Sequence, residues 1–86
     1  MRIRLTIAGR SYHVADKLPA CLEMPAGASL DDALQRLAAS MPSGAALDPR
    51  CLVAVSGLHL GTVQKHRPHA LREGDELLVL TPVAGG

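Results

Sequence analysis

The fold of this chain is decided by the stretch Ser29-Leu30-Asp31-Asp32-Ala33-Leu34-Gln35-Arg36-Leu37-Ala38-Ala39-Ser40-Met41. Its apolar residues recur in steps of three and four, at positions 30, 33, 34, 37, 38 and 41, which is the period of a helix with one apolar face. Ser29 stands three residues before Asp32, as in a capping box, and carboxylates in a first turn suit the positive end of the helix dipole. Pro42 and Gly44 stop the pattern. We predict a helix from Leu30 to Met41 whose apolar face needs a sheet to cover.

Two strands are expected before this helix. In residues 1–7 the apolar side chains occupy the odd positions and alternate with polar ones, which is the pattern of a strand with one buried face. Residues 10–18 have no clear period and are expected to form a long hairpin connection. A second strand is predicted over residues 20–24, with Leu22 and Met24 pointing inward.

Three more strands are expected after the helix. Residues 52–55 are a short continuous apolar run, which is typical of a central strand covered on one face by the helix. Ser56-Gly57 ends this run, and residues 58–60 are expected to form a short edge strand. Residues 73–75, Glu-Gly-Asp, predict a turn before the last strand at residues 76–80.

The order of these elements indicates the fold class. The predicted order is strand, strand, helix, strand, short strand, strand, and a hairpin joined to a later strand through a helix gives a mixed sheet with the helix across one face. This is an α+β arrangement, the β-grasp. No internal repeat or linker interrupts the pattern, so we expect a single domain over residues 1–86, with residues 82–86 as an extended C-terminal tail.

Composition and charge exclude several classes of function. The chain has 86 residues, 48% of them hydrophobic, and its aromatic residue is Tyr12, so the core must be aliphatic. A net charge of +1 gives no electrostatic reason to expect nucleic acid or a membrane surface as a partner. The first residues lack the apolar stretch of a signal peptide, and no run reaches membrane-spanning length. We expect a cytoplasmic protein in which Cys21 and Cys51 are reduced.

Four segments resemble the family of small sulfur carriers that contains the molybdopterin synthase small subunit and the thiamine sulfur carrier. They are residues 23–30, residues 53–57, residues 71–77 and the tail Pro82-Val83-Ala84-Gly85-Gly86. The resemblance implies that the β-grasp is of the ubiquitin-like kind. It also implies that an E1-like adenylyltransferase activates the carboxylate of Gly86, that this carboxylate becomes a thiocarboxylate, and that sulfur is donated inside a complex with a larger subunit. The Pro-Val before the glycines is closer to the molybdopterin branch. Thr81 stands where that branch often has a second proline, and Leu80 where it often has an aromatic residue.

The tail has the properties that this chemistry requires. Its carboxylate has to reach the α-phosphate of ATP inside another protein, and Gly85 and Gly86 have no Cβ to obstruct a narrow channel. Pro82 limits the freedom of the tail near its root, which reduces the entropy lost on insertion. The chain contains no phosphate-binding Gly-rich motif. We therefore expect no bound cofactor, with ATP held by the partner adenylyltransferase and sulfur supplied by a donor protein.

The last strands carry more apolar residues than one buried face requires. Alternate residues of a strand project to opposite faces, so some of these side chains must lie on the face away from the helix. Exposed apolar patches usually mark contacts. We predict that a face including Leu58, Leu60 and Leu80 docks both the adenylyltransferase and the sulfur acceptor, the larger synthase subunit or another enzyme.

Other polar features have ordinary structural interpretations. His66 and His69 lie in a polar segment, residues 62–70, but too few ligands are in view for a metal site, and we predict a solvated loop without a metal. Cys21 and Cys51 could carry sulfur as persulfides, but both adjoin strands, and we predict that they are core thiols.

Several alternative functions remain open from the sequence. The sulfur could be destined for thiamine or another metabolite, or the activated Gly86 could form an isopeptide with lysines of target proteins, as in a ubiquitin-like modifier. A structural β-grasp interaction module would make no use of the Gly86 carboxylate. The two final glycines could also be a frayed chain end.

Overall fold

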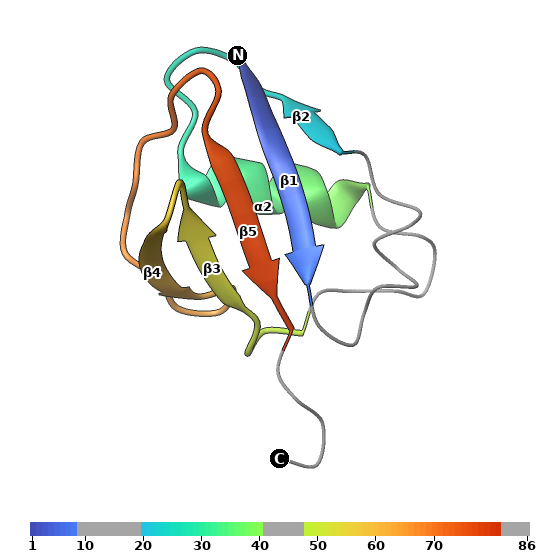
Figure 1. The fold of residues 1–86 in the computed structure, drawn as a ribbon, viewed down its shortest axis with the longest axis vertical. Coiled ribbons are helices and arrows are strands. Elements are labelled where there is room, and N and C mark those ends of the chain that lie inside the picture. Colours follow the sequence, from blue (N-terminus) through green and yellow to red (C-terminus); the bar gives the residue numbers. More distant parts are fainter. Residues whose placement is uncertain (9–19, 41–47, 82–86) are drawn as a thin grey trace.

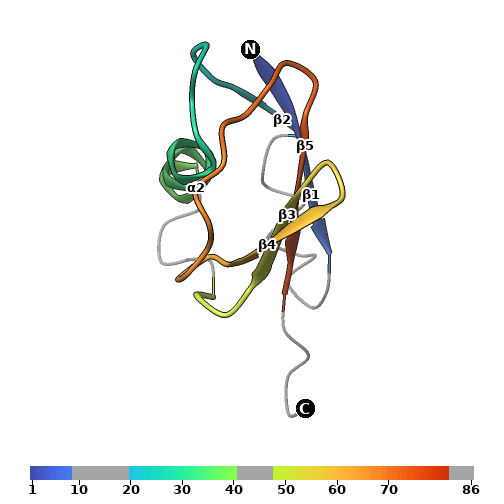
Figure 2. The same cartoon turned by 90° about the vertical axis from the view of Figure 1, so that its left-hand side faces the viewer.

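The computed structural model of this chain describes residues 1–8, 20–40 and 48–81. It contains β1 (Arg2–Ala8), β2 (Cys21–Glu23), α2 (Leu30–Ala39), β3 (Leu52–Val55), β4 (Leu58–Thr62) and β5 (Glu76–Leu80). The strands form one five-stranded sheet in the order β2-β1-β5-β3-β4 (Figure 1). β1 and β5 are parallel, and the other neighbouring pairs are antiparallel. α2 lies across one face of this mixed sheet (Figure 2), which confirms the predicted ubiquitin-like β-grasp.

The start of α2 is formed by the predicted capping box. The amide of Asp32 donates to Oγ of Ser29 over 3.3 Å, and the amide of Ser29 donates to Oδ2 of Asp32 over 2.9 Å. These bonds satisfy two donors that the first helical turn cannot pair internally. The helix ends at Ala39 with Ser40 as its C-cap, whereas the predicted last residue, Met41, lies outside the described residues.

The strands occupy the predicted segments with small changes at their ends. β3 and β5 match their predicted bounds, and β4 continues to Thr62 instead of ending at residue 60. β2 is shorter than predicted, since Ala20 and Met24 flank it rather than belong to it. The predicted connection over residues 10–18 and the tail over residues 82–86 lie outside the described residues.

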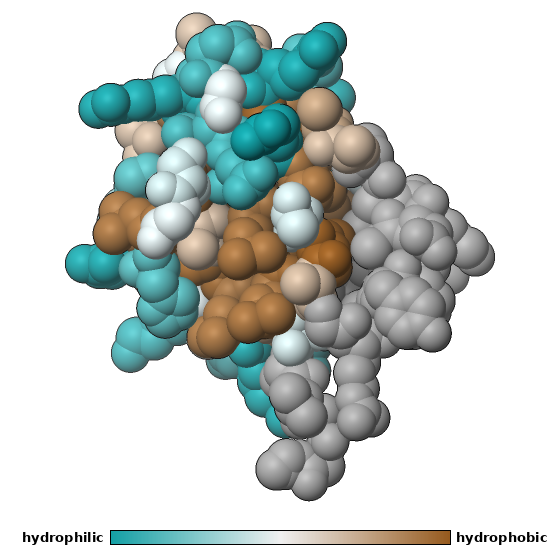
Figure 3. Space-filling view, viewed as in Figure 1, coloured by the Kyte–Doolittle hydropathy of each residue, from teal (hydrophilic) through white to brown (hydrophobic). Residues whose placement is uncertain are grey.

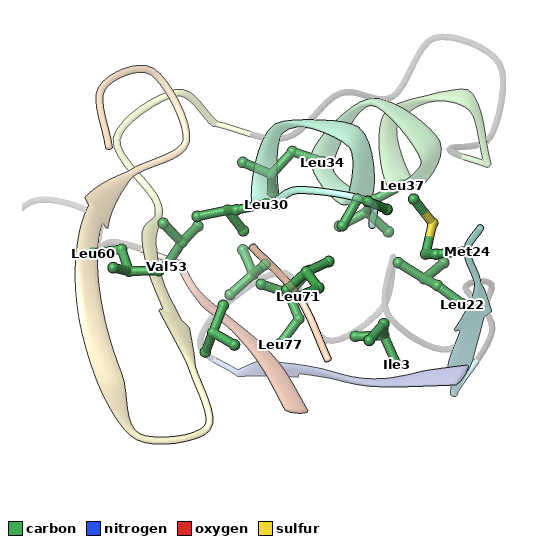
Figure 4. Close-up of a cluster of buried hydrophobic side chains, with 14 of the residues drawn as sticks. Ile3, Leu22, Met24, Leu30, Leu34, Leu37, Val53, Leu60, Leu71 and Leu77 are labelled. Carbon is green, nitrogen blue, oxygen red and sulfur yellow. The ribbon is translucent and has the colours of Figure 1, made fainter. Parts of the chain in front are cut away.

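The core lies between α2 and the sheet, and the described residues that form it are aliphatic apart from the sulfur-containing Met24 and Cys51 (Figure 4). The helix contributes four buried residues, Leu30, Ala33, Leu34 and Leu37. The facing strands contribute Ile3, Leu22, Val53, Val55, Leu60, Leu77 and Val79, and Met24, Ala28, Cys51 and Leu71 complete the cluster. Ala38, which the helical spacing places on the apolar face, is exposed because that face ends at Leu37.

A tight turn and a bulge shape the β3–β4 edge of the sheet. Ser56 and Gly57 form a two-residue turn with φ of 48° and 88°, the positive values that a type I′ hairpin turn requires. Beyond it the register shifts between Ala54, which pairs with His59, and Val53, which pairs with Gly61. Leu60 is therefore the extra residue of a bulge, and a bulge redirects the side chains near it.

Gly61 allows the chain to fold back over β4. Its φ is 135°, and a Cβ placed there would lie 2.4 Å from the carbonyl oxygen of Lys65. The returning segment bonds to the outer edge of β4, since the amide of Thr62 donates to the Lys65 carbonyl and the amide of Arg67 donates to the Leu60 carbonyl. This edge of the sheet is consequently covered, which protects it from pairing with other chains.

Removing a core side chain of α2 should destabilise the fold strongly. Leu37 is fully buried and Leu34 is 7% exposed, so we expect Leu37→Ala or Leu34→Ala to lower the free energy of unfolding by about 2–5 kcal/mol. Gln35→Ala, on the exposed side of the same helix, should change it by less than about 0.5 kcal/mol. Urea denaturation measures both. A loss for Leu37→Ala as small as that for Gln35→Ala would contradict the packing described.

Candidate functional site

The face of the sheet away from α2, called the open face below, holds the candidate site. Residues paired across neighbouring strands project to the same side, so the register defines its rows. These rows are Arg2 with Glu23, Arg4 with Glu76, Thr6 with Leu78 and Ala54, and Ala8 with Leu80 and Leu52. The open face is therefore charged at one end and apolar at the other.

The apolar end of the open face consists of Ala8, Leu52, Ala54, Leu78 and Leu80. Leu52 and Leu80 are 40% and 39% exposed, and the other three are half-buried. Figure 3 shows these hydrophobic residues gathered over β5 and the strands beside it, with hydrophilic residues above them. A contiguous apolar patch with a polar border is typical of a protein-binding surface.

The charged end of the open face is internally paired. Arg2 forms an ion pair with Glu23 over 3.1 Å, and Arg4 forms one with Glu76 over 3.2 Å. All four side chains are well exposed, so these pairs contribute little to stability. Because opposite charges face each other across the strands, the net charge of this end of the open face is close to zero.

The tail begins beside the apolar end. Thr81, the last described residue, follows Leu80 directly, and its amide donates to the carbonyl of Ala8 over 2.9 Å. The predicted site residues Pro82, Val83, Ala84, Gly85 and Gly86 lie outside the described residues. The structure describes the root of the tail, meaning Thr81, and this residue is adjacent to Leu80 and Ala8.

Two of the three predicted docking residues are wrongly placed by the sequence. Leu60 is 5% exposed and belongs to the core on the helix side of the sheet (Figure 4), the same side as Leu58 two residues before it. Leu58 is 48% exposed, but it pairs with the buried Val55 and so projects to the helix side. There it lines a surface depression of about 490 Å³ together with His69. Leu80 alone of the three lies on the open face.

Leu52 and Leu78 belong to the open face, although the sequence did not place them in the docking site. The signal that could have found Leu52 is the alternation within residues 52–55, in which Val53 and Val55 occupy the buried positions. Leu78 follows from the same rule applied between the buried Leu77 and Val79.

His66 is a structural residue that joins the returning segment to α2. Its Nδ1 lies 2.9 Å from the carbonyl oxygen of Thr62, and its Nε2 faces Oδ1 of Asp31. Its side chain is only 9% exposed. His69 lines the depression beside Leu58 instead, and in residues 1–8, 20–40 and 48–81 no three potential metal-ligating side chains gather in one place.

The two contacts of His66 require a doubly protonated ring. A carbonyl oxygen and an ionised carboxylate only accept hydrogen bonds, so both ring nitrogens must donate. Burial lowers the pKa of His66, but the bonds to Thr62 and Asp31 and the charge of Asp31 outweigh burial and raise this pKa above its usual value of 6.5. The ion pair is therefore present at pH values at which most histidine side chains are already neutral.

Stability should consequently fall as the pH rises. A raised folded-state pKa means that the contribution of His66 is complete below 6.5 and is lost as the pH passes through the folded-state value. We expect wild type to exceed His66→Gln by about 1 kcal/mol at about pH 6, since one partner is exposed, and the difference to shrink above neutrality. Urea denaturation across this range measures it.

His59→Gln provides the control for the pH series. The His59 ring is exposed on β4 and makes no hydrogen bond or ion pair within the described part of the chain. Its replacement should leave the pH profile of wild type unchanged. If the profiles of wild type and His66→Gln run parallel, the ion pair with Asp31 does not act in solution.

The two cysteines are free thiols. Cys51 is fully buried in the core, as predicted, and burial raises the pKa of its thiol, which disfavours the nucleophilic thiolate. Cys21 is half-buried on β2 and is not part of the core, contrary to the prediction.

The mixed five-stranded sheet with one helix across it places this chain in the class of ubiquitin-like β-grasp proteins. The model of the ThiS family matches residues 6–86, and the chain belongs to this family of small sulfur carriers. It is 30% identical to the molybdopterin synthase sulfur carrier subunit of Chlamydomonas reinhardtii, with all of both chains covered. No solved structure matches the chain. Within the described ranges, no helix is long and apolar enough to cross a membrane.

Proposed function

We propose that this chain carries sulfur as a thiocarboxylate on Gly86 for molybdopterin synthesis. The observation that carries the proposal is the match to the family and to the algal carrier subunit, which runs over the whole chain up to its two final glycines. The apolar end of the open face lies beside the root of the tail, where a partner that holds the tail has to contact the body.

The proposed chemistry has two steps at the carboxyl group of Gly86. The carboxylate of Gly86 attacks the α-phosphate of ATP and releases pyrophosphate, which leaves an acyl adenylate. A hydrosulfide ion delivered by a donor protein then attacks the carbonyl carbon, AMP leaves with the electron pair of the broken C–O bond, and the thiocarboxylate remains on Gly86. In this proposal the chain supplies the carboxylate, whereas ATP and catalysis belong to an E1-like adenylyltransferase.

The apolar end of the open face is the proposed docking surface for that adenylyltransferase and for the larger subunit of the synthase. The two partners can use this surface in turn, because each of them has to bind the tail that begins beside it. The paired charges at the other end of the open face suit a neutral, mainly apolar contact rather than electrostatic recognition. A cytoplasmic location is part of the proposal, and the two unpaired thiols are compatible with it.

Changing the chain end should abolish adenylation without affecting the fold. Deletion of Gly86, addition of one residue after it, or Gly85→Val should each block ATP–pyrophosphate exchange by the cognate adenylyltransferase. A carboxylate displaced by one residue, about 3.5 Å, misses the α-phosphate, and a channel built for bare backbone rejects a β-branched side chain. Urea denaturation should match wild type. Undiminished exchange by the extended chain would refute the carrier proposal.

Intact-mass analysis tests the product directly. Chain incubated with its adenylyltransferase, ATP and sulfur donor should gain the mass difference between sulfur and oxygen, and the modified chain should support conversion of the molybdopterin precursor by the larger synthase subunit. An isopeptide-linked conjugate with no thiocarboxylate would instead identify a ubiquitin-like modifier. Activity with a thiamine-forming acceptor alone would assign the sulfur to that pathway.

A charge on the open face should prevent docking, whereas the same charge on the helix side should not. Leu80→Asp should weaken binding to both partners by about tenfold or more, because an unpaired carboxylate would be buried in an apolar contact. Leu58→Asp is the matched control, since Leu58 is similarly exposed but projects to the other side. Calorimetric titration with each partner measures the affinities. Equal weakening by the two variants would show that the docking surface is wrongly assigned.

A further inference from the structure

The pairing of β5 with β1 continues one step beyond the strand. In a parallel pair, alternate residues bond to one neighbouring strand and the residues between them face the other neighbour. The amide of Arg4 donates to the carbonyl of Asp75 at the start of this ladder, and the amide of Thr81 donates to the carbonyl of Ala8 at its end. Thr81 therefore continues the series of alternate residues whose backbone groups bond to β1, although it lies just beyond the end of β5.

The side chain of Thr81 reinforces this last bond. Its Oγ1 donates to the same Ala8 carbonyl over 3.1 Å, across a separation of 73 residues. Thr81 is 7% exposed and is the buried polar residue of the described part of the chain. A carbonyl oxygen has two lone pairs and can accept both donors. One acceptor on β1 thus holds the backbone and the side chain of the residue at which the tail begins.

The chain after Thr81 cannot extend the ladder at once, since Pro82 has no N–H. Five residues, 82–86, separate Thr81 from the carboxylate, and they reach at most about 18 Å. If the bond at Thr81 opens, the nearest fixed point is Leu80, which β3 holds through Leu52. The carboxylate of Gly86 is then six residues from the nearest fixed point instead of five.

We infer that the Thr81 hydroxyl is a positioning group for the C-terminal carboxylate, because it keeps the root of the tail closed against β1. This inference rests on the proposed function, in which the carboxylate must enter a partner's site. A closed root means that fewer conformations are lost on insertion, so it acts on binding of the tail. Once the tail is inserted, the partner holds the carboxylate and the chemical step is unaffected.

Two variants separate positioning from stability. Thr81→Val has nearly the same shape and keeps the amide, but it loses the hydroxyl. The Ala8 carbonyl still accepts the amide of residue 81, so this acceptor is not left unpaired, and the midpoint of thermal unfolding should change little. Thr81→Ser keeps the hydroxyl and loses a methyl group, which should lower that midpoint slightly. A merely structural role for Thr81 would make activity follow stability. If the hydroxyl positions the tail, activity should instead fall in Thr81→Val and be retained in Thr81→Ser, whatever the order of their unfolding midpoints.

Two measurements on the full-length chain test the inference. Amide hydrogen exchange at residue 81 should be about fivefold faster in Thr81→Val than in wild type or Thr81→Ser, the effect expected from one hydrogen bond. In ATP–pyrophosphate exchange with the cognate adenylyltransferase, Thr81→Val should raise KM about two- to fivefold with kcat unchanged. Thr81→Ser should retain the wild-type KM.

The outcomes are distinguishable from those that test the carrier proposal. A wild-type KM for Thr81→Val, or a KM raised equally by Thr81→Ser, would overturn the inference while the carrier function stands. A change in kcat alone would also overturn it, because the hydroxyl would then act on the chemical step. An inactive wild-type chain would contradict the carrier function instead, and hydrogen exchange at residue 81 would still test the hold on the root.

Discussion

The parallel pairing of β1 with β5 is the constraint on which the rest of the structure depends. It joins the first strand to the last and runs in register from Arg4 with Glu76 to Ala8 with Leu80. Parallel neighbours cannot be linked by a tight turn, so the intervening chain has to cross over the sheet, and α2 lies on that crossing. β2 and β3 then add to the two outer sides of this central pair.

The crossing also explains why one face of the sheet is buried and the other is open. α2 covers the side of Ile3, Leu77 and Val53, and the segment after β4 closes the same side. That segment is tied to the start of the helix, since the amide of Leu30 donates to the carbonyl of His69 and the ring of His66 contacts Asp31. Nothing comparable covers the open face within the described residues.

Carrier chemistry suits a body organised in this way. In the proposed function the reactive group is the carboxylate of Gly86, and the body has only to present this group and to be recognised by the enzymes that use it. In the proposed function, the apolar end of the open face provides recognition, and the root of the tail at Thr81 provides presentation. Both are consequences of the central pair, since Ala8 belongs to the apolar end and also accepts the two hydrogen bonds of Thr81.

Local physics was sufficient to predict α2 and its capping box, the alternating strands and the order of elements that defines the β-grasp, because each depends on residues a few positions apart. The proposed tail chemistry stays a prediction that rests on residue type alone, since only glycine lacks a Cβ. The side on which Leu58 and Leu60 project was decided by tertiary structure, because it depends on the pairing of Leu58 with the buried Val55 and on which face of the sheet α2 covers. The bonds from Thr81 to Ala8 and from His66 to Asp31 join residues 73 and 35 positions apart, and no local pattern encodes such pairings until the sheet has formed.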